Sequence, residues 1–297
     1  MTSITLLDGG MGQELVHRST AAPTPLWSTQ IMMDDPALVQ AVHTDFYEAG
    51  ATVGTSNTYA IHHDRLAMGE PTSSFAELHD AARDLLVAAS AGRDVRRALA
   101  IGPLGASYRP DLLPAHEKAA ALFAEVAARH ADWCDLVICE TVVSLAHARA
   151  VREGAAVAGK PVWLAFSVDD NDGTRLRSGE PLSDILPVLA EGGVAAVLLN
   201  CSTPEAITTG LPVLAQSGLP YGAYANGFTA ISDGFLEDAP TVDSLSARRD
   251  FSPDDYADHA MGWVEGGATI VGGCCEVSPA HIATLAARLR AAGHTIV

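Results

Sequence analysis

Two adjacent cysteines close a glycine-containing turn near the end of the chain. Cys274 and Cys275 follow Gly272 and Gly273, which in turn follow the apolar run 268–271. On a regular strand, adjacent side chains point to opposite faces. Glycine tolerates positive φ, so we expect the two glycines to turn the chain out of the strand. Both sulfurs can then face one point, as two ligands of one metal ion do.

A third cysteine ends a second apolar run, because Cys201 directly follows residues 194–200. Three thiolates supply three of the four ligands of a tetrahedral zinc ion, and an open fourth position distinguishes catalytic zinc from structural zinc. The simpler alternative is that a free cysteine acts as a small buried hydrophobe. We assign that inert role to Cys134 and Cys139. The usual zinc spacing, C-x2-C twice, is absent from the chain.

The chemistry of such a site favours a thiol substrate. A zinc ion held by three thiolates is a poor Lewis acid for activating water. A substrate thiol has a pKa of about 8.5 and is mostly protonated at neutral pH, whereas coordination to zinc deprotonates it. The reaction class that follows is alkyl transfer to a thiol. A barrel lyase in which the cysteines are redox groups is the alternative.

The rest of the chain alternates short apolar runs with helical patterns. The runs predicted to be strands are 4–7, 51–59, 97–101, 136–139, 161–168, 194–200, 221–227 and 268–271. The helices are predicted at 13–17, 35–49, 75–91, 117–130, 144–156, 181–190, 204–214, 252–265 and 278–291. Short strands that are apolar on both faces and separated by helices run parallel. Eight such units predict an α/β fold, a (β/α)8 or TIM barrel, as a single domain over residues 1–297.

In this barrel the carboxyl ends of the strands share the face that carries the active site. Polar and sulfur-containing side chains occupy these ends. They are Asp8, Asn57, Tyr59, Glu140, Asn200, Cys201, Asn226, Cys274 and Cys275. Their convergence on one mouth favours the zinc hypothesis over inert cysteines. His62 and His63 follow the second strand and are expected to face solvent.

Composition restricts the partners. Hydrophobic residues make up 48% of the chain and charged residues 18%, which indicates a folded core. The formal net charge of −18 argues against nucleic acid and anionic membranes as partners. No apolar run reaches the length of a membrane span. The odd number of cysteines, five, and the lack of a secretory signal before Thr5 predict a cytoplasmic protein with reduced thiols.

These motifs resemble the homocysteine S-methyltransferases, a family that includes S-methylmethionine-dependent and betaine-dependent enzymes. The resemblance covers nearly the whole chain. The motifs that carry it are Asp8 to Gly12, Leu26 to Ser28, Ala49 to Ala51, Thr55 to Tyr59, Ile101 to Pro103, Cys139 to Thr141, Asn200-Cys201, Gly272 to Cys275, and Pro279 with His281-Ile282. Asn-Cys followed later by Gly-Gly-Cys-Cys is the specific part of this pattern.

The resemblance implies a zinc cofactor bound by Cys201, Cys274 and Cys275, in an enzyme that converts homocysteine to methionine. It also implies that Asp8 and Glu140 hold the ammonium group of homocysteine. Backbone N–H groups near Gly9, Gly10 and Met11 would receive its carboxylate, and Asn200 and Tyr59 complete the predicted substrate-binding set. The alternative for the two carboxylates is a structural pairing with a barrel arginine.

The chain departs from the family pattern in features that bear on the choice of methyl donor. After Tyr224, related enzymes often read Pro-Asn, a small residue, Gly and an acid, whereas this chain reads Ala225 to Ala230. The sequence continues for 22 residues after Cys275, so we expect neither the C-terminal arm of the betaine enzymes nor a folate or cobalamin module. We therefore expect a sulfonium donor, S-methylmethionine or S-adenosylmethionine, facing an aromatic side chain such as Tyr59 or Tyr224.

Several alternatives stay open from the sequence. The protein is expected to use small-molecule substrates, but betaine or another onium compound is an alternative donor. A selenol or another thiol is an alternative acceptor, and a zinc-binding barrel without methyl transfer is an alternative to the enzyme. The sequence leaves both a monomer and a dimer possible.

Overall fold

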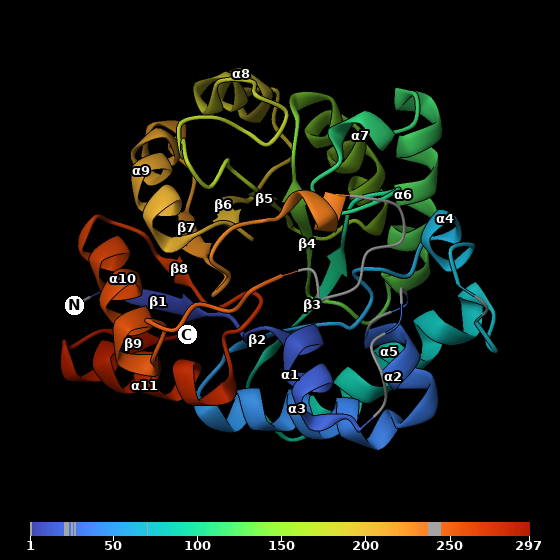
Figure 1. Ribbon diagram of the computed structural model, residues 1–297, viewed down its shortest axis with the longest axis horizontal. Helices are drawn as coiled ribbons and strands as arrows, with labels where there is room; N and C mark the ends of the chain where they lie inside the picture. The colour runs from blue at the N-terminus through green and yellow to red at the C-terminus, as the bar shows by residue number, and fades with distance from the viewer. Residues whose placement is uncertain (1, 21–23, 25, 27, 70, 237–244) are drawn as a thin grey trace.

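The strands of the chain run parallel in a curled sheet, which Figure 1 shows surrounded by helices. The computed structural model describes residues 2–20, 24, 26, 28–69, 71–236 and 245–297. In sheet order the strands are β2 (Val53–Thr55), β3 (Arg96–Ile101), β4 (Leu136–Val142), β5 (Val162–Phe166), β6 (Ala196–Asn200), β7 (Tyr221–Tyr224), β8 (Ile270–Val271) and β1 (Ser3–Leu6). Neighbouring strands in this order are parallel to each other. Each of these strands lies within or overlaps one of the predicted strands.

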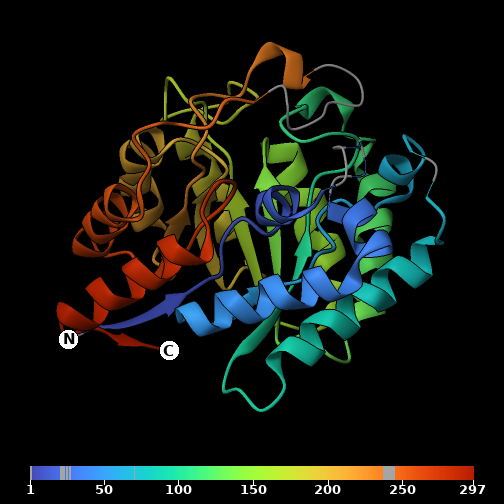
Figure 2. The same cartoon turned by 60° about the horizontal axis from the view of Figure 1, so that its bottom comes forward.

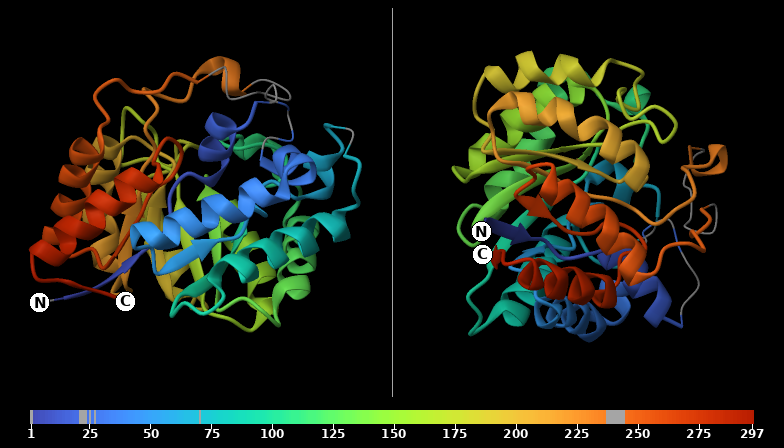
Figure 3. Two further views of the ribbon diagram at one scale, coloured as in Figure 1. Left: turned by 90° about the horizontal axis from the view of Figure 1, so that it is seen from below. Right: turned by 90° about the vertical axis from the view of Figure 1, so that its left-hand side faces the viewer.

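Backbone contacts between β1 and β2 close the sheet into a barrel. Leu7 and Val53 form a parallel bridge just beyond β1, and the N–H of Asp8 donates to the carbonyl of Val53 at 3.0 Å. The predicted α/β barrel fold is thereby confirmed. A further strand that the sequence patterns do not predict, β9 (Thr295–Ile296), pairs with the first half of β1 and lies beside it in Figure 3.

Helices follow the strands around the outside of the barrel (Figure 2). They are α1 (Met11–Arg18), α2 (Ser28–Asp34), α3 (Pro36–Ala49), α4 (His63–Leu66), α5 (Phe75–Ser90), α6 (His116–His130), α7 (Leu145–Ala155), α8 (Ile185–Ala190), α9 (Pro204–Leu214), α10 (Pro253–Glu265) and α11 (Pro279–Ala291). Side-chain caps start several of them, as when the side chain of Ser252 accepts from the N–H of Asp255 at α10. The sequence patterns miss α2 and α4. No described helix is both long and apolar enough to cross a membrane.

The predicted strand 51–59 is longer than the observed β2. Beyond β2, side chains replace the backbone ladder. The hydroxyl of Thr58 donates to the carbonyl of Ala100 at 2.6 Å, and the hydroxyl of Ser56 accepts from the N–H of Ala100 at 3.1 Å. The chain therefore leaves the sheet early and opens toward the barrel mouth.

The predicted strand 221–227 likewise ends early, at Tyr224. The N–H of Asn226 donates to the carbonyl of Ser202 at 3.1 Å, and the N–H of Gly227 donates to that of Cys275 at 2.9 Å. These bonds turn the chain across the mouth, and they join the end of β7 to the segments that carry the cysteines.

Alternate residues of the strands pack together inside the barrel. This buried cluster consists of Leu7, Val53, Ala98, Leu136, Ile138, Trp163, Ala165, Ala196, Leu198, Tyr224 and Ile270. The opposite faces of the strands pack against the helices in a second, larger cluster. Cys134 and Cys139 belong to this larger cluster, where both are free and buried.

Several histidines are buried, contrary to one sequence expectation. His63 has a side chain that is 51% exposed, as predicted. His62 is only 2% exposed, because its ring packs edge-on against Phe123 and its Nε2 lies 3.0 Å from the carbonyl of Gly102. Its predicted solvent exposure is therefore wrong.

His43 on α3 gives a testable consequence of such burial. Its imidazole is 1% exposed, and neither ring nitrogen has a partner among the described residues. Burial lowers the pKa of His43 to about 3. Because the unfolded chain binds this proton more readily, the contribution of neutral His43 to stability is lost as pH falls below about 6.5.

We expect His43→Leu to raise the free energy of unfolding at pH 7 by about 1 kcal/mol. The difference from wild type should widen by up to about 1.4 kcal/mol per pH unit toward pH 4.

Urea unfolding at pH 7, 6 and 5 measures this difference directly. His116→Leu is the control, because the side chain of His116 is 49% exposed and its ring lies in reach of water. Parallel curves of stability against pH for His43→Leu and wild type would contradict the expectation.

Candidate metal and substrate site

A cavity of about 110 Å³ opens at the carboxyl ends of the strands. Of the residues predicted to bind substrate or metal, those that line it are Asp8, Gly9, Gly10, Met11, Tyr59, Glu140, Cys201, Cys274 and Cys275. Asn57, Tyr108, Tyr224 and Phe228 line it as well. The barrel thus brings together side chains that lie far apart in the sequence.

The three predicted ligand cysteines lie together at the cavity wall. Their Sγ atoms all lie within 4.8 Å of one another, and no disulfide joins them. In a tetrahedral zinc site, bonds of about 2.3 Å place the sulfurs about 3.8 Å apart. Among the described residues, this is the only group of three or more Cys, His, Asp or Glu side chains with such spacing. The donor set therefore fits a zinc ion with an open fourth position.

The glycines before the cysteines act differently from the prediction. Neither Gly272 nor Gly273 has positive φ. A Cβ at Gly272 would overlap Leu7, and a Cβ at Gly273 would overlap Val277. Glycine is required here because the chain passes close to its neighbours, so the predicted left-handed turn at these two positions is wrong.

Left-handed backbone instead occurs at non-glycine residues. In the described part of the chain these are Tyr108, Thr141, Cys201 and Glu276, with φ of 64°, 54°, 48° and 66°. Each lines the cavity or directly follows a residue that does. This conformation costs a non-glycine residue about 1–2 kcal/mol, and such strain concentrates at functional sites. The sequence carries no signal for it, since these residue types give no hint of positive φ.

Proton sharing links the three thiols. Hydrogen bonds from Cys274 and then Cys275 lower the pKa of Cys201 well below its usual range. The same contacts with Cys201 raise the pKa values of Cys274 and Cys275 well above theirs. Metal ligands must be thiolates, so a divalent metal bound here would displace the protons that the three thiols share.

Two carboxylates face the same cavity, from buried Asp8 and half-buried Glu140. Asp8 is 3% exposed and accepts hydrogen bonds from the N–H and hydroxyl of Thr55, at 2.7 and 3.0 Å. Burial raises the pKa of Asp8 to about 7. Burial, followed by the charge on Cys201, raises the pKa of Glu140 to about 8.

Neither carboxylate has a cationic partner in the described structure, and no arginine or lysine contributes to either pKa shift. The structural alternative, an ion pair with a barrel arginine, is therefore absent from the described residues. The hydroxyl of Tyr224 donates to Glu140 at 2.9 Å, so Tyr224 orients this carboxylate.

Two predicted mouth residues do not line the cavity. Asn200 is fully buried, and its Oδ1 accepts from the N–H of Thr141 at 3.0 Å. This bond holds the irregular turn of β4 between Cys139 and Val142. The Oδ1 of Asn226 accepts from the N–H of Phe228 at 3.2 Å. Both asparagines thus shape the loops around the cavity.

The segment after β7, where the sequence departs from the family pattern, packs over the cysteines. Ile231, Leu236 and Leu245 contact a small buried cluster of Tyr108 and Cys201. Leu236 ends the short 3-10 helix η5 (Asp233–Leu236), which crosses the mouth in Figure 1. Residues 237–244 of this segment, and Trp27 in the motif Leu26 to Ser28, lie outside the described residues.

Comparisons with known proteins match nearly the whole chain. The family model described as homocysteine S-methyltransferase matches residues 5–289. The homocysteine S-methyltransferase of Escherichia coli (strain K12) is 30% identical and aligns with 96% of this chain and 95% of its own. The selenocysteine Se-methyltransferase of Brassica oleracea var. italica is 25% identical over 96% of this chain and 88% of its own.

Solved structures give the same relationship. The metallated form of the homocysteine methyltransferase MmuM from Escherichia coli superposes with a TM-score of 0.78 at 28% identity. The alignment covers 97% of this chain and 96% of that one. The similarity therefore extends over nearly the whole chain.

Proposed function

This chain belongs to the homocysteine S-methyltransferase family, and on that premise we propose that it transfers a methyl group from a sulfonium donor to the thiol of L-homocysteine, in a zinc-dependent reaction that gives methionine. The observation that carries the proposal is the cavity itself, where three cysteine sulfurs lie within 4.8 Å of one another beside two carboxylates that have no cationic partner in the described part of the chain. Zinc held by Cys201, Cys274 and Cys275 would supply the acidity that turns the substrate thiol into a nucleophilic thiolate.

The chain's own residues would bind the amino-acid end of homocysteine. Asp8 and Glu140 offer two carboxylates of the cavity lining to its ammonium group, and charge-assisted hydrogen bonds of this kind are the strong ones. For the carboxylate of homocysteine, the N–H groups of Gly10 and Met11 are already used by the carbonyls of Val277 and Gly9. The next N–H groups of the first turn of α1 lack partners within the helix and are the better donors.

The site takes residues from the loops after most of the strands. Asp8 follows β1, Tyr59 follows β2, Tyr108 follows β3, and Cys274 follows β8. No shorter part of the barrel contains the full set. We therefore propose that residues 1–297 act as one catalytic domain.

Two features support a sulfonium donor. A methyl group leaves a sulfonium centre more readily than a quaternary ammonium. The cavity lining contains four aromatic side chains and two carboxylates but no lysine or arginine in the described residues, and this composition suits a cationic ligand. Phe228 joins the predicted Tyr59 and Tyr224 as a candidate to face the cationic methyl, because the ring of Tyr59 already lies 5.4 Å from the guanidinium carbon of Arg65.

We expect S-methylmethionine to be used in preference to betaine. A difference of about 1.4 kcal/mol in activation free energy would make kcat/KM about tenfold higher for the sulfonium donor. Steady-state rates with homocysteine and each donor, with S-adenosylmethionine as a third arm, measure this preference. A value for betaine equal to or above that for S-methylmethionine would overturn the proposed donor class.

A selenol acceptor is the second candidate, since one relative is named a selenocysteine Se-methyltransferase. Competition between homocysteine and selenocysteine for one methyl donor distinguishes the two acceptors. Preferential methylation of selenocysteine would replace the proposed acceptor while leaving the zinc proposal in place.

A further inference from the structure

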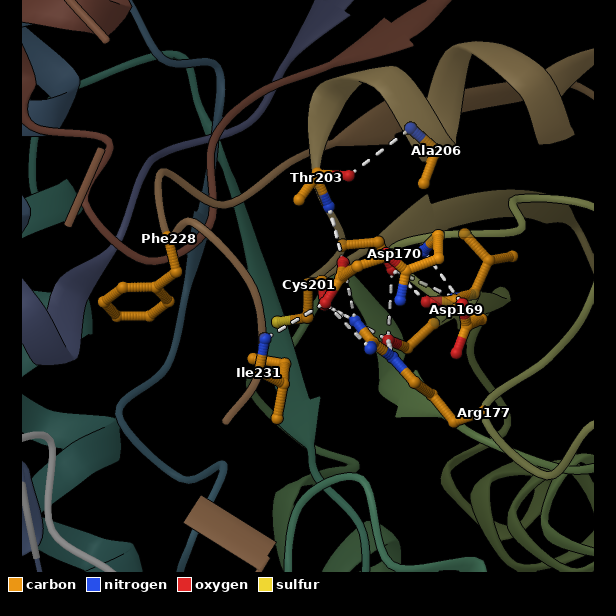
Figure 4. A network of polar contacts seen from close by, with 12 residues as sticks. Asp169, Asp170, Arg177, Cys201, Thr203, Ala206, Phe228 and Ile231 are labelled. Atoms are coloured by element: carbon orange, nitrogen blue, oxygen red, sulfur yellow. Dashed lines mark hydrogen bonds and ion pairs between the residues drawn. The ribbon is translucent and has the colours of Figure 1, made fainter. Parts of the chain in front are cut away.

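A buried ion pair lies in the loop after β5, close to one of the proposed zinc ligands (Figure 4). The two terminal nitrogens of the Arg177 guanidinium donate to the carboxylate of Asp170, with Nη1 to Oδ2 and Nη2 to Oδ1 each at 2.9 Å. The two side chains are only 10% and 6% exposed. Every other ion pair of the described residues has at least one partner that is more exposed than either of these.

Arg177 reaches the backbone of Cys201. Its Nη2 donates to the carbonyl of Cys201 at 3.2 Å, and its Nε donates to Oγ of Ser167 at 3.1 Å. The hydroxyl of Ser167 donates to the same carbonyl, also at 3.2 Å. Cys201 has a φ of 48°, which is unfavourable for a residue with a side chain. Two donors on one carbonyl fix the peptide in this conformation, and the conformation sets the direction of the thiol.

Asp170 accepts hydrogen bonds from two neighbouring loops close to Cys201. Its Oδ1 accepts from the N–H of Thr203 at 3.0 Å, just after Cys201, and its Oδ2 accepts from the N–H of Ile231 at 3.1 Å, in the segment after β7. The guanidinium carbon of Arg177 also lies 5.1 Å from the ring centroid of Tyr108, which packs against Cys201. The pair therefore joins the loops after β3, β5, β6 and β7 around a single cysteine.

We propose that Asp170 and Arg177 are positioning residues that hold Cys201 in the orientation needed to bind zinc with Cys274 and Cys275. This inference rests on the proposed zinc function. A buried ion pair is weak evidence for stability, since desolvation offsets much of the attraction. Groups that orient a metal ligand, in contrast, commonly affect metal affinity. Here the hydrogen bonds act on the ligand's backbone, so they determine where its sulfur points.

The double variant Asp170→Asn/Arg177→Met tests the proposal, because it removes both charges and leaves neither buried alone. Zn²⁺ affinity is measured by competition with a chromophoric chelator, and the thiolate-to-metal absorption of the Co²⁺-substituted protein reports the ligand geometry. We expect Zn²⁺ to bind about 10- to 100-fold more weakly, with an altered Co²⁺ spectrum. Thermal unfolding of the metal-free proteins measures any purely structural effect separately.

Arg175→Met is the matched control. Arg175 lies in the same loop, where its Nε is 3.3 Å from Asp172 and the two side chains are 54% and 48% exposed. Wild-type affinity and spectrum are expected for this variant. Arg177→Lys adds a milder test that retains the charge but loses the planar fork, and we expect a smaller loss of Zn²⁺ affinity.

The outcomes separate this proposal from the proposed function. If the double variant and Arg177→Lys bind Zn²⁺ as tightly as wild type with an unchanged Co²⁺ spectrum, the positioning role is overturned and the zinc proposal stands. If the double variant does not fold, the result for Arg177→Lys decides. Failure of the wild-type protein to bind Zn²⁺ would overturn the zinc proposal and this inference with it.

Discussion

Cys201→Ala, Cys274→Ala and Cys275→Ala are each expected to reduce methyl transfer to homocysteine to the background rate and to lower zinc content well below about one ion per chain. Each substitution removes one of three protein ligands from a site that must also leave a fourth position for substrate. The fold should survive, because all three cysteines lie beyond the ends of the strands that carry them. Zinc analysis of the purified variants, circular dichroism and steady-state rates together measure the three effects.

Cys134→Ala and Cys139→Ala are the matched controls. Both cysteines are free and buried in the core, at 1% and 0% exposure, and neither lines the cavity. We expect them to retain zinc and activity and to lose about 1 kcal/mol of stability from the space left by the sulfur. Any one of the three site variants that kept both full zinc and full activity would remove its cysteine from the proposed ligand set.

The architecture could be predicted from the sequence because it depends on a repeated local pattern. Short runs such as 194–200, apolar on both sides, alternate with amphipathic helices, and only a parallel sheet covered by helices buries both faces. The ends of the strands were less predictable. The run 51–59 begins as a strand and opens into a polar tip, where the hydroxyls of Ser56 and Thr58 bond the backbone of the neighbouring strand and end the ladder.

Most of the residues that line the cavity could also be predicted from the sequence. The barrel rule places strand-end residues at one mouth, and Asp8, Glu140 and the three cysteines do line one cavity. The rule does not say which way a side chain turns. Asn200 ends β6 as expected, yet its amide turns to the backbone of Thr141. Direction depends on tertiary hydrogen bonds, which no local pattern encodes.

For the same reason, the sequence does not predict the residues that surround and support the three cysteines. Tyr108 enters the cavity through a left-handed backbone conformation, and the Asp170–Arg177 pair reaches Cys201 from a different loop. In the sequence, Asp170 and Arg177 are two charged residues in a polar loop, which is typical of a solvated surface. Their burial arises only when the loops after β5, β6 and β7 pack together.

The second large effect is expected at the carboxylates. Glu140→Gln and Asp8→Asn should each lower kcat/KM for homocysteine by up to roughly 30- to 150-fold. This corresponds to a loss of about 2–3 kcal/mol of binding free energy in the transition state. The reason is the loss of a charged acceptor for the substrate's ammonium group. Zinc content should be unchanged, because neither side chain belongs to the sulfur cluster. Glu153→Gln is the control, since the side chain of Glu153 is 64% exposed and lies on α7.

The stability of the ligand-free protein should move in the opposite direction, and this distinguishes a binding role from a structural one. The pKa of Glu140 is raised from 4.5 to about 8, so the folded state holds this proton more tightly than the unfolded state. Its contribution to stability is then fully present below about pH 4.5 and is lost as pH rises toward 8, by up to about 1.4 kcal/mol per pH unit. Glu140→Gln removes this cost, so at pH 8 the variant should be at least as stable as wild type although it uses homocysteine poorly.

If Glu140 were instead a structural partner of a cation, the same change would destabilise the protein, and kcat/KM would fall only with the loss of folded protein. Urea unfolding and homocysteine kinetics on the same preparations at pH 6 and pH 8 decide between the two, and unchanged kinetics or a loss of zinc in Glu140→Gln would count against the proposed ammonium site.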